Sequence, residues 1–73
     1  MLEMIGKRIQ ELRISKTNMS QESFSKYIGL DRTYLSRIES GKQNLTLDTI
    51  ILICKGLGVS LSEFFMPFKD FIE

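Results

Sequence analysis

QESFSKYIGLDRTYLSRIESG, residues 21–41 of a 73-residue chain, is the stretch that decides the fold. Its large apolar residues recur at helical spacing on either side of Gly29, and they are Phe24, Ile28, Leu35 and Ile38. Glycine at position 29 tolerates the left-handed backbone that ends a helix abruptly, so the pattern breaks at this point. The stretch predicts two short helices, at about residues 21–28 and 31–40, joined by a tight turn.

Capping residues fix the ends of these helices and predict two more. A side chain that can accept a hydrogen bond from a first helical turn precedes four segments: Ser20, Asp31, Thr46 and Ser60. Thr46 is expected to open a helix that reaches residue 57 and stops at Gly58. Ser60 is followed by Glu63 at the spacing of a capping box, which predicts a shorter helix. Pro67 ends that helix or begins another turn.

The remaining helix and the core faces follow from the same periodicity. Four apolar residues predict a first helix over about residues 2–15: Leu2, Ile5, Ile9 and Leu12. Five residues after Thr46 fall within an arc of roughly 120° and form a core face: Leu47, Ile50, Ile53, Cys54 and Leu57. The chain shows no strand-like alternation and no internal repeat. We therefore expect one all-α domain over residues 1–73, a compact five-helix bundle.

Basic residues are concentrated in the part of the chain that holds the two-helix stretch. Residues 1–44 contain 8 Lys and Arg against 5 acidic residues, a net +3, whereas residues 45–73 contain 2 against 4, a net −2. A basic surface attracts nucleic acid, although a solvated helical surface can show the same asymmetry. The second helix of the stretch begins with Asp31-Arg32-Thr33-Tyr34, a polar start of the kind that DNA-reading helices present to the major groove.

The chain lacks the groups that enzymes and metal sites need. It has no histidine, and its single cysteine, Cys54, lies in an apolar run where we expect a small buried hydrophobe. The sequence contains no glycine-rich phosphate loop, so we expect no enzyme activity, no metal and no cofactor. It also shows no targeting segment and no apolar run of transmembrane length. We expect a cytoplasmic protein without a membrane partner.

The two-helix stretch resembles the helix-turn-helix of the Cro/C1 family, also called XRE-like. The matching residues are Gln21, Ser25, Gly29, Leu30, Leu35, Ser36, Ile38, Glu39 and Gly41, and further matches extend the resemblance over nearly the whole chain. Residues 31–36, DRTYLS, followed by Asn44-Leu45-Thr46-Leu47, are most similar to controller proteins of bacterial restriction-modification systems. The resemblance implies a lambda-repressor-like fold with the helix-turn-helix at the second and third helices.

The same resemblance implies a function. Controller proteins are homodimers that bind palindromic operators and act as activators and repressors of their own gene and the endonuclease gene. The expected partners are therefore double-stranded DNA, a second copy of the chain and RNA polymerase. Three alternatives stay open: a phage-type repressor, an antitoxin, and a helix-turn-helix module used mainly for protein binding.

The start of the third helix supplies the expected base readers. Arg32 can donate two hydrogen bonds to guanine, and Thr33 offers a hydroxyl together with a methyl that suits thymine. Arg37, on the same exposed face, is expected to contact a base or the adjacent backbone. The alternatives are a phosphate contact or a surface salt bridge for Arg32, and a helix-start residue without a DNA role for Thr33.

Six residues are expected to contact the DNA backbone: Gln21, Tyr34, Ser36, Lys42, Gln43 and Asn44. The resemblance implies that Gln21 bonds a phosphate and braces the recognition helix, and that the loop after this helix touches the sugar-phosphate backbone. Tyr34 is equally expected to be partly core. Some controller proteins carry an arginine at the position of Gln43, so this chain departs from them at one expected phosphate contact.

Two further groups concern structure and assembly. The resemblance implies an ion pair inside the domain between Arg13 and Glu39. Ile51 and Leu52 lie outside the core arc of their helix, and together with the apolar tail they form a candidate dimer patch: Ile51, Leu52, Phe65, Phe68 and Phe71. The alternative is a tail folded over its own core.

Overall fold

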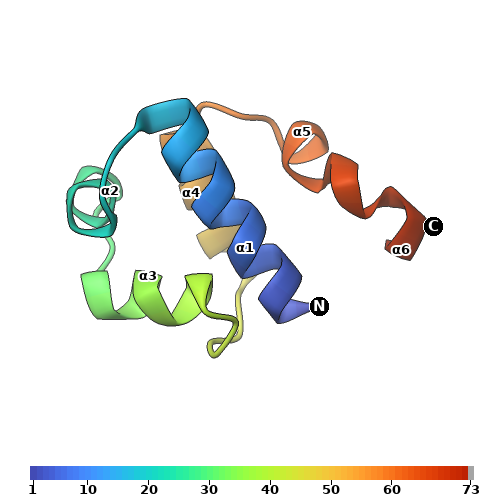
Figure 1. Cartoon of the computed structure of the whole chain (residues 1–73), viewed down its shortest axis with the longest axis horizontal. Coiled ribbons are helices and arrows are strands. Elements are labelled where there is room, and N and C mark those ends of the chain that lie inside the picture. The colour runs from blue at the N-terminus through green and yellow to red at the C-terminus, as the bar shows by residue number, and fades with distance from the viewer. Residues whose placement is uncertain (73) are drawn as a thin grey trace.

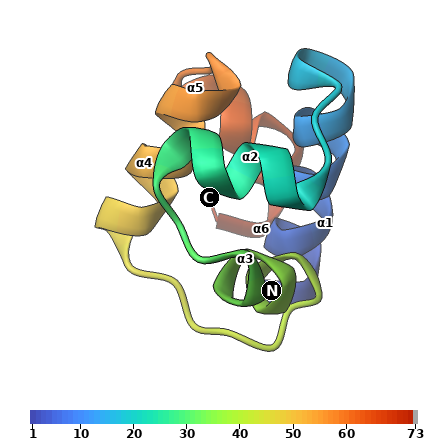
Figure 2. The same ribbon diagram turned by 90° about the vertical axis from the view of Figure 1, so that its left-hand side faces the viewer.

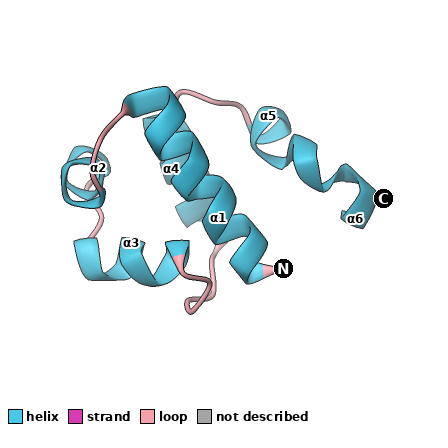
Figure 3. Ribbon diagram, viewed as in Figure 1, coloured by secondary structure: helices cyan, strands magenta, loops and turns pink. Residues whose placement is uncertain are grey.

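The chain is helical throughout the part that the structure describes. A computed structural model describes the backbone of residues 1–72 and the side chains of residues 1–70. Figure 3 shows helices and loops and no strand within this range. The elements are α1 (Leu2–Leu12), the π-helical turn η1 (Arg13–Thr17), α2 (Gln21–Ile28), α3 (Arg32–Glu39), α4 (Leu47–Leu57), α5 (Leu61–Phe65), the 3-10 turn η2 (Met66–Phe68) and α6 (Lys69–Ile72). The predicted all-α fold is confirmed, and Pro67 begins a further turn that leads into α6.

The helices form three groups along the longest dimension of the molecule, which is 34 Å. Figure 1 shows α2 and α3 at one end, α1 and α4 in the middle, and α5 with α6 at the other end. Helix α1 packs against α3, and α4 packs against both α2 and α5. The predicted helix-turn-helix therefore rests on α1 and α4, which hold it away from the C-terminal tail.

All four predicted N-caps are present. Ser20, Thr46 and Ser60 each accept a hydrogen bond from the backbone N–H three residues on, at 3.0, 3.2 and 3.0 Å. Asp31 Oδ2 accepts two, from the N–H groups of Thr33 and Tyr34 at 3.0 and 3.2 Å. The capping box is only half formed, because the Glu63 carboxylate pairs with Lys16 Nζ at 3.3 Å.

The first helical segment is two residues longer than predicted. After α1 the chain continues through η1 and ends at Asn18, which adopts a left-handed backbone with φ 55°. The Asn18 N–H donates to the Arg13 carbonyl at 3.1 Å, and the Thr17 hydroxyl donates to the same oxygen at 2.6 Å. A threonine side chain thus satisfies the backbone at the end of the helix, which the polar composition of this segment alone did not indicate.

The core joins residues from every helix from α1 to α5. Its fully buried large apolar residues are Ile9, Phe24, Leu35, Ile38, Ile53 and Phe64. Gly6 lets α1 approach α3 closely, since a Cβ at this position would lie 2.6 Å from the Glu39 carbonyl oxygen. Cys54 is buried as predicted, and burial raises the pKa of its thiol.

The prediction that Leu47 belongs to the core is wrong, because its side chain is 61% exposed. Leu47 is the first residue of α4, and helical side chains lean toward the N-terminus of their helix, which here carries the leucine beyond the packed part of the core. The periodicity placed it on the correct face but did not show where the neighbouring helices end.

Within residues 1–72 no single helix is long and apolar enough to cross a membrane. The helices from 47 to 57 and from 61 to 68 reach the required length only together, and they are bent by 102° at the break between them.

Candidate nucleic-acid interface

The turn between α2 and α3 sets the position of the recognition helix. Gly29 ends α2 with φ 75°, and the Leu30 N–H donates to the Ser25 carbonyl at 2.8 Å. Ser25 is 2% exposed, and its hydroxyl is satisfied by the Glu22 carbonyl at 2.9 Å. A small side chain without an unpaired polar atom lets α3 cross α2 closely, as Figure 2 shows from the end of the molecule.

At the N-terminal end of α3, two polar side chains form no hydrogen bond within the described part of the protein. Arg32 and Thr33 are both exposed, and neither side chain forms a hydrogen bond or an ion pair with any residue whose side chain is described. Asp31 fixes their backbone through its two capping bonds. Tyr34 follows them half-buried and packs against the core, which favours the partly structural interpretation of this residue. The two predicted base readers therefore stand on a rigid helix start with all their donors available.

The C-terminal end of α3 is tied to η1 by the predicted ion pair. Arg13 Nε lies 2.8 Å from Glu39 Oε2, and Arg13 Nη2 lies 3.1 Å from Glu39 Oε1. Both side chains are less than 10% exposed, at 8% and 3%. Arg13 Nη1 also donates to the Met19 carbonyl at 2.7 Å, so a two-bond pair and a backbone contact hold η1, the loop before α2 and the end of α3 together.

Gln21 joins this network from the first turn of α2. Its amide Nε2 donates to Glu39 Oε1 at 2.9 Å, so the side chain braces α3 as the resemblance implied. An amide nitrogen carries two hydrogens, and the second one has no acceptor among the described residues. Gln21 thus keeps one donor that is compatible with the phosphate contact predicted for it.

A small cleft of about 190 Å³ adjoins Gln21, between α1 and α3. Gln10, Gln21, Ser36, Glu39 and Ser40 line it. Ser36, predicted to contact backbone, lies at this cleft, whereas Gln10 was not predicted as a site residue. Gln10 precedes Arg13 by three residues and lies on the same face of the helix. The expected ion pair between Arg13 and Glu39 could therefore have indicated that Gln10 lies near this site.

Arg37 behaves differently from Arg32, although both were predicted to meet bases. Its Nε donates to Gln43 Oε1 at 3.2 Å and its Nη2 donates to the Lys42 carbonyl at 2.9 Å. The side chain is exposed but lies along the loop that follows α3. Lys42 and Asn44 in that loop are exposed and Gln43 is half-buried. Arg37 therefore contacts two of the three loop residues that were predicted to touch the DNA backbone, Lys42 and Gln43.

Two of the arginines among residues 1–44 form hydrogen bonds inside the domain. Arg13 is in the buried network, and Arg8 donates to the carbonyls of Phe64 and Glu63 at 3.0 and 2.8 Å, which ties α1 to α5. No local pattern in the sequence indicates that Arg8 has a partner more than fifty residues away. The basic surface available to a polyanion is therefore smaller than the charge count suggested.

The candidate dimer patch is only partly exposed. Phe68 is 4% exposed and belongs to the monomer core, so its assignment to the patch is wrong; the tail folds over its own core at this residue. Ile51 and Phe65 are half-buried and Leu52 is 37% exposed. Phe71 lies outside the residues whose side chains are described.

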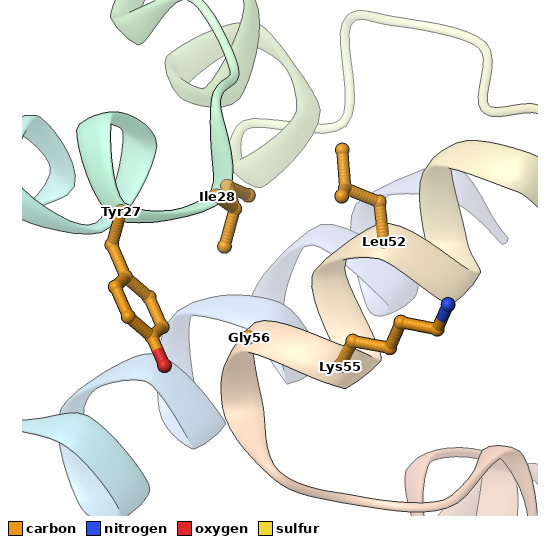
Figure 4. A pocket seen from close by; sticks show the side chains of 5 residues that line it. All are labelled: Tyr27, Ile28, Leu52, Lys55 and Gly56. Carbon is orange, nitrogen blue, oxygen red and sulfur yellow. The ribbon is translucent and has the colours of Figure 1, made fainter.

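Leu52 also lines an open groove of about 300 Å³ between α2 and α4. Figure 4 shows Tyr27 and Ile28 entering this groove from α2, and Leu52, Lys55 and Gly56 bounding it on α4. Within the described part of the chain, no group of three or more His, Cys, Asp or Glu side chains could hold a metal ion.

Comparison with known proteins identifies the architecture. Residues 9–64 match the sequence profile of a helix-turn-helix family. The control protein C.MunI from Mycoplasma sp is 52% identical over 60 residues, which cover 82% of this chain and 81% of that protein. The control protein C.BamHI from Bacillus amyloliquefaciens is 46% identical over 56 residues, which cover 77% of this chain and 69% of that protein.

Solved structures give the same result. The wild-type restriction-modification controller protein C.Esp1396I superposes with a TM-score of 0.84 at 40% identity, over 99% of this chain and 95% of that one. The same controller protein as a tetramer in complex with its natural 35 base-pair operator superposes with a TM-score of 0.83, over the same shares of the two chains.

Proposed function

The chain belongs to the Cro/C1-type helix-turn-helix family, among the controller proteins, and we propose from this that it acts as a DNA-binding transcriptional regulator. It binds a palindromic operator as a homodimer and controls its own gene and an endonuclease gene of a restriction-modification system. These matches do not favour an antitoxin, a phage-type repressor or a protein-binding module. A regulator of this kind acts in the cytoplasm, where its DNA is.

The observation that carries the proposal is a contrast along α3 between side chains without an internal hydrogen-bond partner and a side chain that has two. Arg32 and Thr33 have no internal partner among the described residues, whereas Glu39 at the other end of the helix is held by Arg13 and Gln21. The helix is therefore fixed from behind while its N-terminal end presents donors, which is how recognition helices enter the major groove. Arg32 reads guanine, and Thr33 contacts the neighbouring base.

Backbone contacts surround this reader and fix its register on the duplex. Gln21, with its free amide hydrogen, and Ser36 approach a phosphate on one side of α3. Lys42, Gln43 and Asn44 approach the backbone on the other side, from the loop after the helix. Tyr34 contributes through its half-buried ring to the position of the helix start and reaches the backbone with its hydroxyl.

A single helix-turn-helix reads too few base pairs to be specific, so we propose dimerisation through Ile51, Leu52 and Phe65. Two rigidly joined copies read half-sites about one helical turn apart, ~34 Å. At a high-affinity site the dimer activates transcription through a contact with RNA polymerase. At a second site, filled at higher protein concentration, it blocks the promoter.

Selection of bound duplexes from a random pool tests the proposal directly. We expect the full chain to enrich a palindrome whose half-sites are centred about 10 to 10.5 base pairs apart or a multiple of that spacing. Enrichment of a single, asymmetric site would contradict the dimer. Retention of the pool without any enriched sequence would contradict sequence-specific binding, and with it the regulatory function.

Leu52→Glu tests the dimer seam, because a charge in an apolar interface costs far more than one in water. We expect monomers in sedimentation equilibrium at concentrations where the natural chain is dimeric. Ile14→Glu is the matched control, since Ile14 is an apolar residue of η1 that is 53% exposed and lies outside the patch. Unchanged dimer mass in Leu52→Glu would remove this residue from the seam.

A further inference from the structure

Arg37 differs from Arg32, the other basic residue of α3, because its side chain binds the loop that follows the helix. Its Nε donates to the Gln43 side chain at 3.2 Å, and its Nη2 donates to the Lys42 carbonyl at 2.9 Å. Both bonds direct the guanidinium toward the C-terminal end of α3. Arg37 lies five positions after Arg32, which is about 7.5 Å along the helix axis.

The backbone carbonyl of Arg37 also forms hydrogen bonds with the start of this loop. Its carbonyl accepts a hydrogen bond from the Lys42 N–H at 2.9 Å and one from the Ser40 hydroxyl at 3.1 Å. Gly41, with φ 76°, packs against the start of α1, where an added Cβ would lie 2.7 Å from the Glu3 Cα. The start of the loop is therefore fixed between Arg37 and α1.

The bound guanidinium still has donors to offer. It carries five N–H groups, of which Gln43 and the Lys42 carbonyl use one each, so three are left. Arg37 and Lys42 are both exposed, and neither forms an ion pair with a carboxylate among the residues whose side chains are described. The loop thus presents two adjacent positive charges, of which the Arg37 guanidinium is held by two hydrogen bonds.

We propose that Arg37 is a phosphate-binding residue that organises this loop for contact with the DNA backbone, and not a reader of bases. This proposal rests on the proposed function, because the phosphate that Arg37 binds belongs to the operator DNA. Reading a base edge would require the guanidinium to leave both of its hydrogen bonds and turn toward the opposite end of α3. A phosphate at the loop can accept hydrogen bonds from the free donors while both existing bonds stay in place, and the charge of Lys42 adds to the attraction.

Binding measurements on two duplexes separate the two roles of an arginine. The first duplex is the sequence recovered from the random pool, and the second is a scrambled duplex of the same length and composition. Arg37→Ala and Arg32→Ala are compared with Lys26→Ala, an exposed residue of α2 that pairs with Glu22 at 3.6 Å within its own helix. Circular dichroism and thermal unfolding establish that each variant is folded.

We expect Arg37→Ala to weaken binding to both duplexes by the same factor, about two- to tenfold, and to lower the slope of log K against log salt by about 0.9 for each phosphate that the protein no longer neutralises. Arg32→Ala should instead weaken binding to the selected duplex far more than to the scrambled one. A relaxed preference at one base-pair position in Arg37→Ala, or unchanged affinity and slope, would overturn the assignment of Arg37. Loss of discrimination in the unaltered chain would instead refute the proposed function.

A double-mutant cycle tests whether the loop and the arginine act together. Gln43→Ala removes the acceptor of Arg37 Nε, so we expect it to weaken binding to both duplexes in the natural background. In the Arg37→Ala background its effect should be smaller, because only the contact of Gln43 itself with the DNA backbone is then lost. Arg37→Lys keeps the charge but loses the planar fork, and we expect it to restore part of the salt dependence. Equal effects of Gln43→Ala in both backgrounds would show that the two residues act independently, against the proposal.

Discussion

The two ends of α3 face different neighbours and have opposite requirements. At the C-terminal end, Glu39 is buried, and Arg13 and Gln21 share its carboxylate. At the N-terminal end, Arg32 and Thr33 are exposed and have no side-chain partner within the described residues, while Asp31 holds only their backbone. One end therefore contributes to folding and the other leaves its side chains for a ligand. The side chains that are held by hydrogen bonds therefore lie at the opposite end of α3 from the exposed side chains of Arg32 and Thr33.

The largest effect should come from breaking the buried end. Glu39→Ala leaves the Arg13 guanidinium buried without its counter-charge, which costs about 3 to 5 kcal/mol. A domain of this size has roughly 4 to 11 kcal/mol of stability, so the variant should be close to unfolded at 37 °C. Chemical denaturation followed by circular dichroism measures the loss.

The matched control is the double replacement Arg13→Met with Glu39→Leu, which removes both charges and keeps apolar volume. We expect it to be more stable than either single variant, because no unpaired charge is left buried. A loss below about 1 kcal/mol in both single variants would show that the buried pair does not hold the end of α3.

The next effect concerns binding and should leave the fold intact. Arg32→Ala should lose about 1 to 3 kcal/mol of discrimination at one base-pair position of the operator, since its two donors to guanine disappear. Its unfolding free energy should stay within about 0.5 kcal/mol of the natural chain, because the side chain has no internal partner among the described residues. Competition binding with single-position variants of the operator measures the first quantity. Equal weakening on specific and random duplexes would show that Arg32 binds only phosphate.

The smallest effect should come from the cap that supports the free end. Asp31→Ala removes the acceptor for two backbone N–H groups and should cost about 1 kcal/mol, a fall in Tm of roughly 4 to 8 °C. Asp31→Asn keeps an acceptor oxygen and should lose less. The same loss in both variants, measured by thermal unfolding, would show that capping is not what Asp31 contributes.

Local signals made α2, the turn and α3 predictable from the sequence. Ser20, Gly29 and Asp31 determine the backbone through contacts within a few residues of themselves, and their effects appear in the structure as expected. Thr46 does the same for α4. The exposed positions of Arg32 and Thr33 follow from the same periodicity, because residues off the apolar stripe of a short helix face water.

Tertiary contacts account for what could not be predicted. Arg8 binds carbonyls of Glu63 and Phe64, at the far end of the sequence, and no local pattern indicates that pairing. Phe68 is covered by its own chain because η2 redirects the tail, which the apolar composition of the tail leaves open. The orientation of Arg37 depends on the path of the loop after α3, and that path is set by the contact between Gly41 and the start of α1.

The freedom of the Arg32 and Thr33 side chains has an evolutionary consequence. Because these two residues form no side-chain bond within the described chain, replacing them changes what the protein recognises and leaves the folding free energy almost unchanged. A lineage can therefore acquire a new operator through a few codon changes, without compensating mutations elsewhere. The same freedom makes α3 a ready starting point for engineering regulators that ignore one another's promoters.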